Sequence, residues 1–214
     1  MTLHVNEIFF SIQGESLHAG RPCVFVRLTG CNLRCSYCDT TYAYAEGTFF
    51  PVSAVVEKIS AFPCRLVEIT GGEPLVQPET LLLVTTLLEK GFEVLLETNG
   101  SIDIGNVDLR CVKIVDVKCP SSNESHRNNL NNLLLLSPRD QLKFVLCDRK
   151  DFNFAVQILK QLPAHLPPDH VLFSPAYHIL PPDQLADWIL SAKLPVRLHL
   201  QLHKIIWPHI ERGV

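Results

Sequence analysis

Seven short and almost uninterrupted apolar runs recur along the sequence, and they narrow its fold more than any other feature. Each is followed by turn-forming or polar residues, and together they cover residues 22–30, 65–72, 92–100, 111–120, 141–148, 170–177 and 196–204. Such runs are typical of parallel strands that are covered on both faces. The preceding stretch NEIFFSIQGE, residues 6–15, is expected to pair with the first run as a hairpin.

Helical segments are expected between these strands, over residues 52–61, 78–91, 124–136, 151–162 and 182–193. The second of them has proline at its start and glycine at its end, which are typical helix boundaries. Alternating strands and helices indicate βα units and a parallel sheet. A complete eight-unit barrel needs about 250 residues, and this chain has 214. We therefore predict an α/β fold, a partial TIM-like barrel of about six parallel βα units, in a single domain over residues 1–214.

The composition excludes several classes of function. Charged residues make up 19% of the chain and the formal net charge is −3, so no basic surface for nucleic acid is indicated. The stretch MTLHVNEIFFSIQGE lacks the basic and apolar regions of a signal peptide, and the apolar run 133–136 is too short to span a bilayer. We expect a cytoplasmic protein with no membrane or nucleic-acid partner, whose eight cysteines are thiols or metal ligands rather than disulfides.

Three cysteines, Cys31, Cys35 and Cys38, follow the first apolar run with the spacing C-x3-C-x2-C. Zinc sites and four-cysteine clusters usually have four protein ligands. Three thiolates can instead hold three irons of a 4Fe–4S cluster and leave the fourth iron open to an amine and a carboxylate. S-adenosylmethionine has both groups, and its reductive cleavage beside a cluster yields a 5′-deoxyadenosyl radical. The alternative is a zinc knuckle completed by a residue elsewhere, such as His18 or Cys23.

Polar residues follow most of the predicted strands, where parallel sheets place their active sites. They are expected to surround the three cysteines on one rim, and they occupy residues 70–73, 97–100, 116–118, 174–175 and 201–204. The remaining cysteines are expected to pack as small apolar residues, and they are Cys23, Cys64, Cys111, Cys119 and Cys147.

Two motifs resemble the radical S-adenosylmethionine superfamily: the cysteine spacing with Tyr37 before the last cysteine, and the GGEP turn at residues 71–74. Four further stretches narrow the resemblance to the 7-carboxy-7-deazaguanine synthases of queuosine and 7-deazapurine biosynthesis, over almost the whole chain. They are SIQGE at 11–15, VFVRLTGCNLRCSYCDT at 24–40, DVKCPSS at 116–122 and QLHK at 201–204.

The resemblance implies a radical S-adenosylmethionine core with reduced helices, a homodimer, and a carbon–nitrogen lyase activity. Members convert 6-carboxy-5,6,7,8-tetrahydropterin into 7-carboxy-7-deazaguanine with loss of ammonia. They use a 4Fe–4S cluster, S-adenosylmethionine and Mg²⁺, and they receive electrons from a donor such as flavodoxin or ferredoxin.

The resemblance also assigns roles to residues. Cys31, Cys35 and Cys38 are assigned as the cluster ligands, and the hydroxyl of Thr40 is assigned as a ligand of Mg²⁺. The alternative is that Thr40 is an ordinary loop threonine or a helix N-cap. The resemblance places S-adenosylmethionine against Tyr37, Cys38, Asp39, Gly72, Asp116, Val117, Lys118, Ser174, Pro175, Ala176 and Tyr177.

The pterin is expected to contact Ile12, Gln13, Gly14, Glu15, Arg27, Thr70 and His203. Arg27 lies in an apolar run, and a buried guanidinium needs an anion. The substrate carboxylate is one candidate, and an internal ion pair with Glu68 or Asp116 is the other. Asn123 stands where the resemblance leads us to expect glycine, and this departure leaves the local loop conformation open. Glycine tolerates a positive φ best, and asparagine is next.

Three rival functions fit parts of the pattern. A glycyl-radical activase would share the cysteines and the GGE turn, but it usually continues after the last cysteine with His-Asn, and SIQGE and QLHK have no place in it. A zinc-binding module would contain zinc in place of iron. An electron carrier would have the cluster but no use for S-adenosylmethionine.

Overall fold

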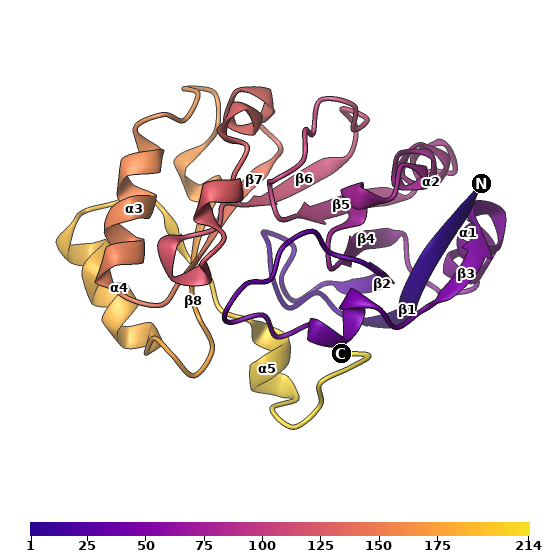
Figure 1. The fold of residues 1–214 in the computed structure, drawn as a ribbon, viewed down its shortest axis with the longest axis horizontal. Helices are drawn as coiled ribbons and strands as arrows, with labels where there is room; N and C mark the ends of the chain where they lie inside the picture. Colours follow the sequence, from indigo (N-terminus) through magenta and orange to yellow (C-terminus); the bar gives the residue numbers. More distant parts are fainter.

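The computed structural model describes residues 1–214 and is built on one nine-stranded sheet in the order β3-β1-β2-β4-β5-β6-β7-β8-β9 (Figure 1). Every pairing from β2 to β9 is parallel, whereas β1 is antiparallel to both β2 and β3. The end strands β3 and β9 do not pair with each other, so the barrel is open. The strands are β1 Thr2–Ile12, β2 Pro22–Leu28, β3 Thr48–Pro51, β4 Leu66–Gly71, β5 Glu93–Thr98, β6 Val112–Asp116, β7 Gln141–Leu146, β8 Val171–Pro175 and β9 Arg197–Leu198.

Helices cover the outer face of this sheet. In Figure 1, α1 and α2 lie at the β1 end, and α3 and α4 lie at the β8 end. The helices are α1 Val52–Ser60, α2 Glu79–Glu89, α3 Arg149–Leu159, α4 Pro182–Ser191 and α5 Leu202–Ile206. The buried residues of α1 to α4 join the outward-facing residues of the strands in one large apolar cluster, whereas α5 has no buried residue and contributes to the cavity lining. None of the helices combines the length and the apolar character needed to cross a membrane.

The inner face of the sheet changes character along the strands. Toward their amino ends, a small apolar cluster fills the interior: Cys23, Phe25, Leu66, Leu95, Val112 and Ile114. Toward the carboxyl ends the same face carries charged and polar side chains: Arg27, Glu68, Thr70, Glu97, Asp116 and Lys143. Because strand side chains alternate between faces, these polar residues are hidden in runs that otherwise appear apolar. The interior of the barrel is therefore polar toward the carboxyl ends of the strands. Toward their amino ends it is filled by the small apolar cluster, here named the apolar plug.

Most of the predicted elements are confirmed. The first six apolar runs form β2 and β4 to β8, residues 6–15 begin within β1 and form the expected hairpin, and four of the five predicted helices form α1 to α4. The prediction of about six parallel βα units in an open α/β barrel is therefore confirmed. The short strand β3, which extends the sheet at the edge of β1, was not predicted.

Two predicted elements are wrong. Residues 196–204 form only the two-residue strand β9, and the chain then turns into α5, because Leu202 N donates to Gly14 O (2.8 Å) across the end of the barrel. Residues 124–136 form short 3₁₀ turns, Ser125–Arg127 and Leu130–Leu135, in place of an α-helix. The Asn132 side chain there donates to Gly100 O and Ile102 O. Asparagines that bind backbone groups in this way compete with helix formation.

Asn123 adopts the left-handed conformation, with φ 63° and ψ 5°, at the end of the 3₁₀ turn Pro120–Ser122. The loop thus has the conformation that glycine tolerates best and asparagine next best. Asn123→Ala is expected to lower the free energy of unfolding by about 1 kcal/mol, because a Cβ-bearing residue without a short polar side chain disfavours this region. Asn123→Gly is expected to cost less. Urea denaturation of the three proteins tests this, and equal stability of the alanine and glycine variants would contradict it.

Candidate active site

A cavity opens at the carboxyl ends of the parallel strands. Residues of β2, β4 to β8 and the loops after them line it, together with residues of α5 and the last residue, Val214. All the site residues predicted from the sequence line it except Val117 and Ala176. Both are buried. The Val117 amide donates to Lys143 O (2.9 Å) and the Ala176 amide donates to Leu146 O (2.8 Å), so these two residues support the backbone next to the cavity lining.

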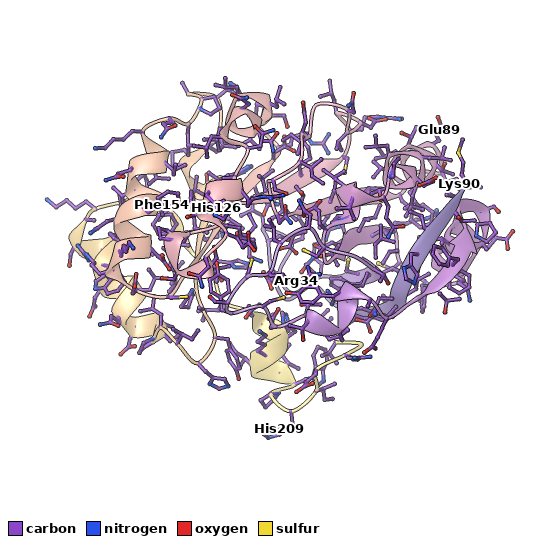
Figure 2. The ribbon with its side chains drawn as sticks, viewed as in Figure 1. Arg34, Glu89, Lys90, His126, Phe154 and His209 are labelled. Carbon is purple, nitrogen blue, oxygen red and sulfur yellow. The ribbon has the colours of Figure 1, made fainter.

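The three cysteines lie in the loop that follows β2, residues 29–40, here named the cysteine loop. Cys31, Cys35 and Cys38 all line the cavity, and none of the other five cysteines does. The neighbouring 116–124 segment holds the loop in place: Ser36 N donates to Ser122 O (3.1 Å) and Arg34 N donates to Glu124 Oε1 (2.7 Å). Figure 2 shows Arg34 on this loop near the middle of the molecule.

The GGEP turn packs directly against the cysteine loop. A Cβ on Gly72 would lie 2.4 Å from Gly30 O and 2.7 Å from the Cβ of Cys31, so no side chain fits there without moving the cysteines. Glu73 is fully buried and does not face the cavity. Its carboxylate accepts hydrogen bonds from Thr98 Oγ1 (2.8 Å), Asn99 N (2.6 Å) and Leu75 N (3.0 Å). Glu73 thus ties the turn to the end of β5.

The cysteines suit a cluster better than a single ion. No three His, Cys, Asp or Glu side chains converge closely enough to hold one metal ion. The zinc alternative named His18 or Cys23 as a fourth ligand, but neither lines the cavity. His18 lies 2.6 Å from Arg21, and Cys23 is buried in the apolar plug. Three thiols around a cavity, without a fourth protein ligand, match a 4Fe–4S cluster with one iron open to an external ligand.

Two buried polar atoms in the wall lack a protein partner, namely the hydroxyl of Tyr37 and Oδ1 of Asp116. The other oxygen of Asp116 accepts from the Lys118 ammonium at 2.6 Å. Burial alone would lower the pKa of Lys118, but the Asp116 carboxylate keeps it above its ordinary value. Unpaired buried polar atoms are costly, so these two mark a place where a polar ligand would complete the wall.

Thr40 and Asp39 form a cluster of oxygens at the edge of the cavity. Thr40 Oγ1 donates to Asp39 Oδ1 (2.9 Å), and Asp39 also pairs with Lys204 of α5. Burial would raise the pKa of Asp39, but Lys204 holds it below its ordinary value. Thr40 precedes the 3₁₀ turn Thr41–Tyr44, yet its side chain makes no capping hydrogen bond.

Five side chains of the cavity lining are here named the cavity floor. They are four titratable groups, Glu15, Glu68, Glu97 and Lys143, and the amide of Gln13. Lys143 pairs with Glu15 and, at 2.7 Å, with Glu97. Gln13 Nε2 donates to Glu68, while Gln13 Oε1 accepts from Glu15 N (2.9 Å), so both ends of this amide are engaged. Burial, followed by the charges of Glu97 and Glu15, raises the pKa of Glu68 well above its ordinary value. Burial and two acidic neighbours thus disfavour the charged form of Glu68.

Arg27 lines the cavity, but its internal partner differs from both predicted candidates. Its Nε donates to Glu7 Oε1 at 2.7 Å, not to Glu68 or Asp116. Glu7 stands opposite Arg27 in the antiparallel register of β1 and β2, which the sequence did not reveal. The two terminal nitrogens of the guanidinium make no hydrogen bond with the protein, so the outer fork stays available to an anion.

The C-terminal segment, residues 199–214, lines one side of the cavity. A Cβ on Gly14 would lie 2.2 Å from Nδ1 of His203, so this glycine lets α5 pack onto the SIQGE turn. Farther on, Arg212 pairs with Glu46 (2.9 Å) and stacks on the Tyr42 ring (4.1 Å). Figure 1 shows the chain end returning to the region of β1 and the Thr41–Tyr44 turn, and Figure 2 shows His209 at the outer tip of this segment.

Comparison with known proteins identifies the family. The model of the Radical SAM superfamily matches residues 25–109, which include the three cysteines and the GGEP turn. The 7-carboxy-7-deazaguanine synthase of Koribacter versatilis is 42% identical over 99% of this chain and 100% of the relative. The synthase of the same name from Chlorobaculum tepidum is 43% identical over 99% of this chain and 97% of the relative. This chain belongs to the 7-carboxy-7-deazaguanine synthase family.

The fold agrees with this membership. The crystal structure of QueE from Escherichia coli superposes with a TM-score of 0.74 and covers 95% of both chains, although only 22% of the residues are identical. The open barrel is therefore shared with that protein.

In this member of the synthase family, Lys143 lines the cavity without having been predicted as a site residue. Lys143 carried a signal, because a lone lysine in an apolar run needs a buried partner. Lys113 carries the same signal, yet it pairs with Asp140 (3.0 Å) away from the cavity. The pattern thus indicates a buried ion pair without revealing its place.

Glu68→Gln tests the raised pKa of Glu68. The folded protein binds a proton on Glu68 that the unfolded chain has lost above the ordinary pKa, so this site disfavours folding increasingly as pH rises. The glutamine variant lacks this effect. Its melting temperature relative to the parent protein is expected to rise between pH 5.5 and pH 8.5.

Glu57→Gln, on the exposed face of α1, is the control for loss of a surface carboxylate. If the melting curves of Glu68→Gln and the parent protein stay a constant distance apart over this pH range, Glu68 is ionised in the folded state.

Proposed function

We infer that this chain catalyses the conversion of 6-carboxy-5,6,7,8-tetrahydropterin to 7-carboxy-7-deazaguanine with loss of ammonia, as a carbon–nitrogen lyase of queuosine and 7-deazapurine biosynthesis. The observation that carries this conclusion is the full-length similarity to synthases of that name. The cavity supports it, because the motifs that define the resemblance converge there from distant parts of the chain.

The residues present fit the cofactors of such an enzyme. Cys31, Cys35 and Cys38 would hold three irons of the cluster. When bound, the cluster and S-adenosylmethionine supply the one-electron chemistry that removes a hydrogen atom from the substrate. Tyr37, Gly72, Asp116, Lys118 and the 174–177 segment would surround S-adenosylmethionine, and the unpartnered oxygens of Tyr37 and Asp116 support this placement.

The opposite half of the cavity would hold the pterin. The free fork of Arg27 suits the substrate carboxylate, and Thr70 and His203 line the same space. Burial lowers the pKa of His203, which favours the neutral imidazole as a hydrogen-bonding group. Gln13 and Glu15 form the turn beneath α5, and the C-terminal segment would exclude water from the bound substrate.

We further propose that Thr40 ligates Mg²⁺ with substrate oxygens and water as the other ligands. Magnesium prefers oxygen ligands and keeps several waters. The uncapped Thr40 hydroxyl at the cavity edge, next to the Asp39 carboxylate, supports this assignment.

The remaining proposals rest on the family resemblance. The chain would act in the cytoplasm as a homodimer and would receive electrons from a donor such as flavodoxin or ferredoxin. Residues 1–214 would form one domain, which the single continuous sheet supports. Sedimentation of the reconstituted protein tests the dimer.

The activity is tested with the anaerobically reconstituted protein, S-adenosylmethionine, Mg²⁺, a reductant and the pterin. We expect 7-carboxy-7-deazaguanine over many turnovers, without matching accumulation of 5′-deoxyadenosine. Cys35→Ala is expected to lose the cluster absorbance and to have an activity at least 100-fold lower. This corresponds to an activation barrier higher by about 3 kcal/mol. Cys64→Ala, outside the cavity, is the control and is expected to keep both.

Two results would count against the function. Slow release of 5′-deoxyadenosine without the deazaguanine would keep the radical chemistry and discard this substrate. Bound zinc and no cluster would discard both.

Thr40→Ala tests the magnesium site. Loss of one protein oxygen is expected to raise the Mg²⁺ concentration for half-maximal activity by about tenfold or more, as loss of a metal-supporting group commonly does. Thr41→Ala, at the adjacent exposed residue, is the matched control. An unchanged Mg²⁺ requirement in Thr40→Ala would place the metal elsewhere.

A further inference from the structure

Lys143 is a buried lysine in the middle of β7, and its ammonium faces the cavity. Its side chain is 7% exposed, and its Nζ contacts one oxygen of Glu15 and, at 2.7 Å, Oε1 of Glu97. The two carboxylates come from different parts of the chain, the turn after β1 and the carboxyl end of β5. Lys143 therefore joins three segments at the cavity floor.

The oxygens of the two carboxylates are used unequally. Glu15 is engaged at both oxygens, because Oε2 meets Lys143 and Oε1 accepts from Gln201 Nε2 at 2.8 Å. Glu97 is engaged only at Oε1. Its side chain keeps 22% of its surface exposed to the cavity, and its Oε2 has no protein donor. Glu97 is thus the floor carboxylate with an acceptor free for a ligand.

The charge on Glu97 depends on Lys143. Burial raises the pKa of Glu97, and the Lys143 ammonium opposes that rise. Burial would lower the pKa of Lys143 itself, but Glu15 and Glu97 hold it well above its ordinary value. Without the ammonium, Glu15, Glu68 and Glu97 would share a buried site with no cation in contact. Like charges so placed retain a proton.

Other titratable groups face the same floor. Asp116 of β6 is paired with Lys118, and Glu68 of β4 accepts a hydrogen bond from the Gln13 amide. From the C-terminal segment, burial lowers the pKa of His199 to about 4 and also lowers that of His203. Neither imidazole is expected to gain a proton above pH 6.5, so a pH response in that range belongs to the carboxylates.

We propose that Lys143 is a positioning residue for the substrate: its ammonium bridges Glu15 and Glu97 and keeps Glu97 ionised, with one oxygen aimed into the cavity to accept hydrogen bonds from the amine and amide edge of the pterin. This inference rests on the proposed function. An ionised carboxylate accepts at both oxygens and forms the stronger hydrogen bond. A protonated carboxyl group would instead place an O–H donor opposite the N–H donors of the pterin edge, and two donors do not form a hydrogen bond with each other.

The test compares the Michaelis constant for the pterin between pH 6.5 and 9 in the reconstituted enzyme and its Lys143→Met variant. At pH 7 the variant is expected to have a Michaelis constant at least tenfold higher, with the turnover number changed less than threefold. The defect is expected to shrink as pH rises, because the less stabilised Glu97 then loses its proton. The parent enzyme is expected to change little over this range. Calorimetric titration of the pterin into the holoenzyme should give the same affinity ratio.

Three further variants separate positioning from folding. Lys143→Arg keeps the charge and is expected to recover most of the affinity. Glu97→Gln is nearly isosteric, keeps a hydrogen-bonding oxygen toward Lys143, and is expected to raise the Michaelis constant equally at all pH values. It keeps the proposal testable if Lys143→Met does not fold. Lys113→Met removes the other buried lysine, outside the cavity, and is expected to lower the melting temperature without a pH-dependent change in the Michaelis constant.

Two results would overturn the proposal. One is an unchanged Michaelis constant in Glu97→Gln. The other is a Lys143→Met defect that does not vary with pH and matches that of Lys113→Met. If the parent enzyme forms no 7-carboxy-7-deazaguanine at all, the proposed function fails first, and that outcome is distinct from a working enzyme with insensitive variants.

Discussion

A buried ammonium between two carboxylates is the interaction on which the cavity depends. Lys143 on β7 holds Glu15, from the turn after β1, and Glu97, from the end of β5. An uncompensated buried charge is strongly destabilising, and breaking such a pair typically costs about 3–5 kcal/mol. The barrel can carry acidic groups inside because this one cation meets two of them, while Glu68 accepts a hydrogen bond from Gln13 and has its pKa raised by burial. The floor side chains are therefore tied to one another by ion pairs and a hydrogen bond.

Close contacts at two glycines hold the segments around the rim of the cavity together, as the ion pairs hold the cavity floor together. Gly72 lets the GGEP turn touch the cysteine loop, and Gly14 lets His203 rest on the SIQGE turn. Each contact joins two motifs that are far apart in sequence, and each requires a residue without a side chain. Glu73 adds a third tie, from the GGEP turn to the end of β5. The parallel strands bring the motifs to one rim, and these contacts fix the distances between them.

The parallel strands and the place of the site could be predicted from the sequence, because each depends on local patterns. Apolar runs fix strands, and the cysteines and GGEP follow two of them directly. Other features depend on partners that no local pattern names. Arg27 pairs with Glu7 because of the β1–β2 register, and α5 begins where Gly14 accepts a hydrogen bond, although the run 196–204 has the composition of a strand. Lys143 and Lys113 are alike in sequence, and only the three-dimensional packing separates the site residue from the structural one.

The most direct test is an anaerobic crystal structure of the reconstituted protein with S-adenosylmethionine and the pterin bound. The account predicts the cluster on Cys31, Cys35 and Cys38, the pterin carboxylate at the free fork of Arg27, and the amine and amide edge of the pterin at Glu97. Lys143 should remain in contact with both Glu15 and Glu97. A pterin whose carboxylate replaces Glu97 on the Lys143 ammonium would contradict it, because Lys143 would then bind the substrate itself.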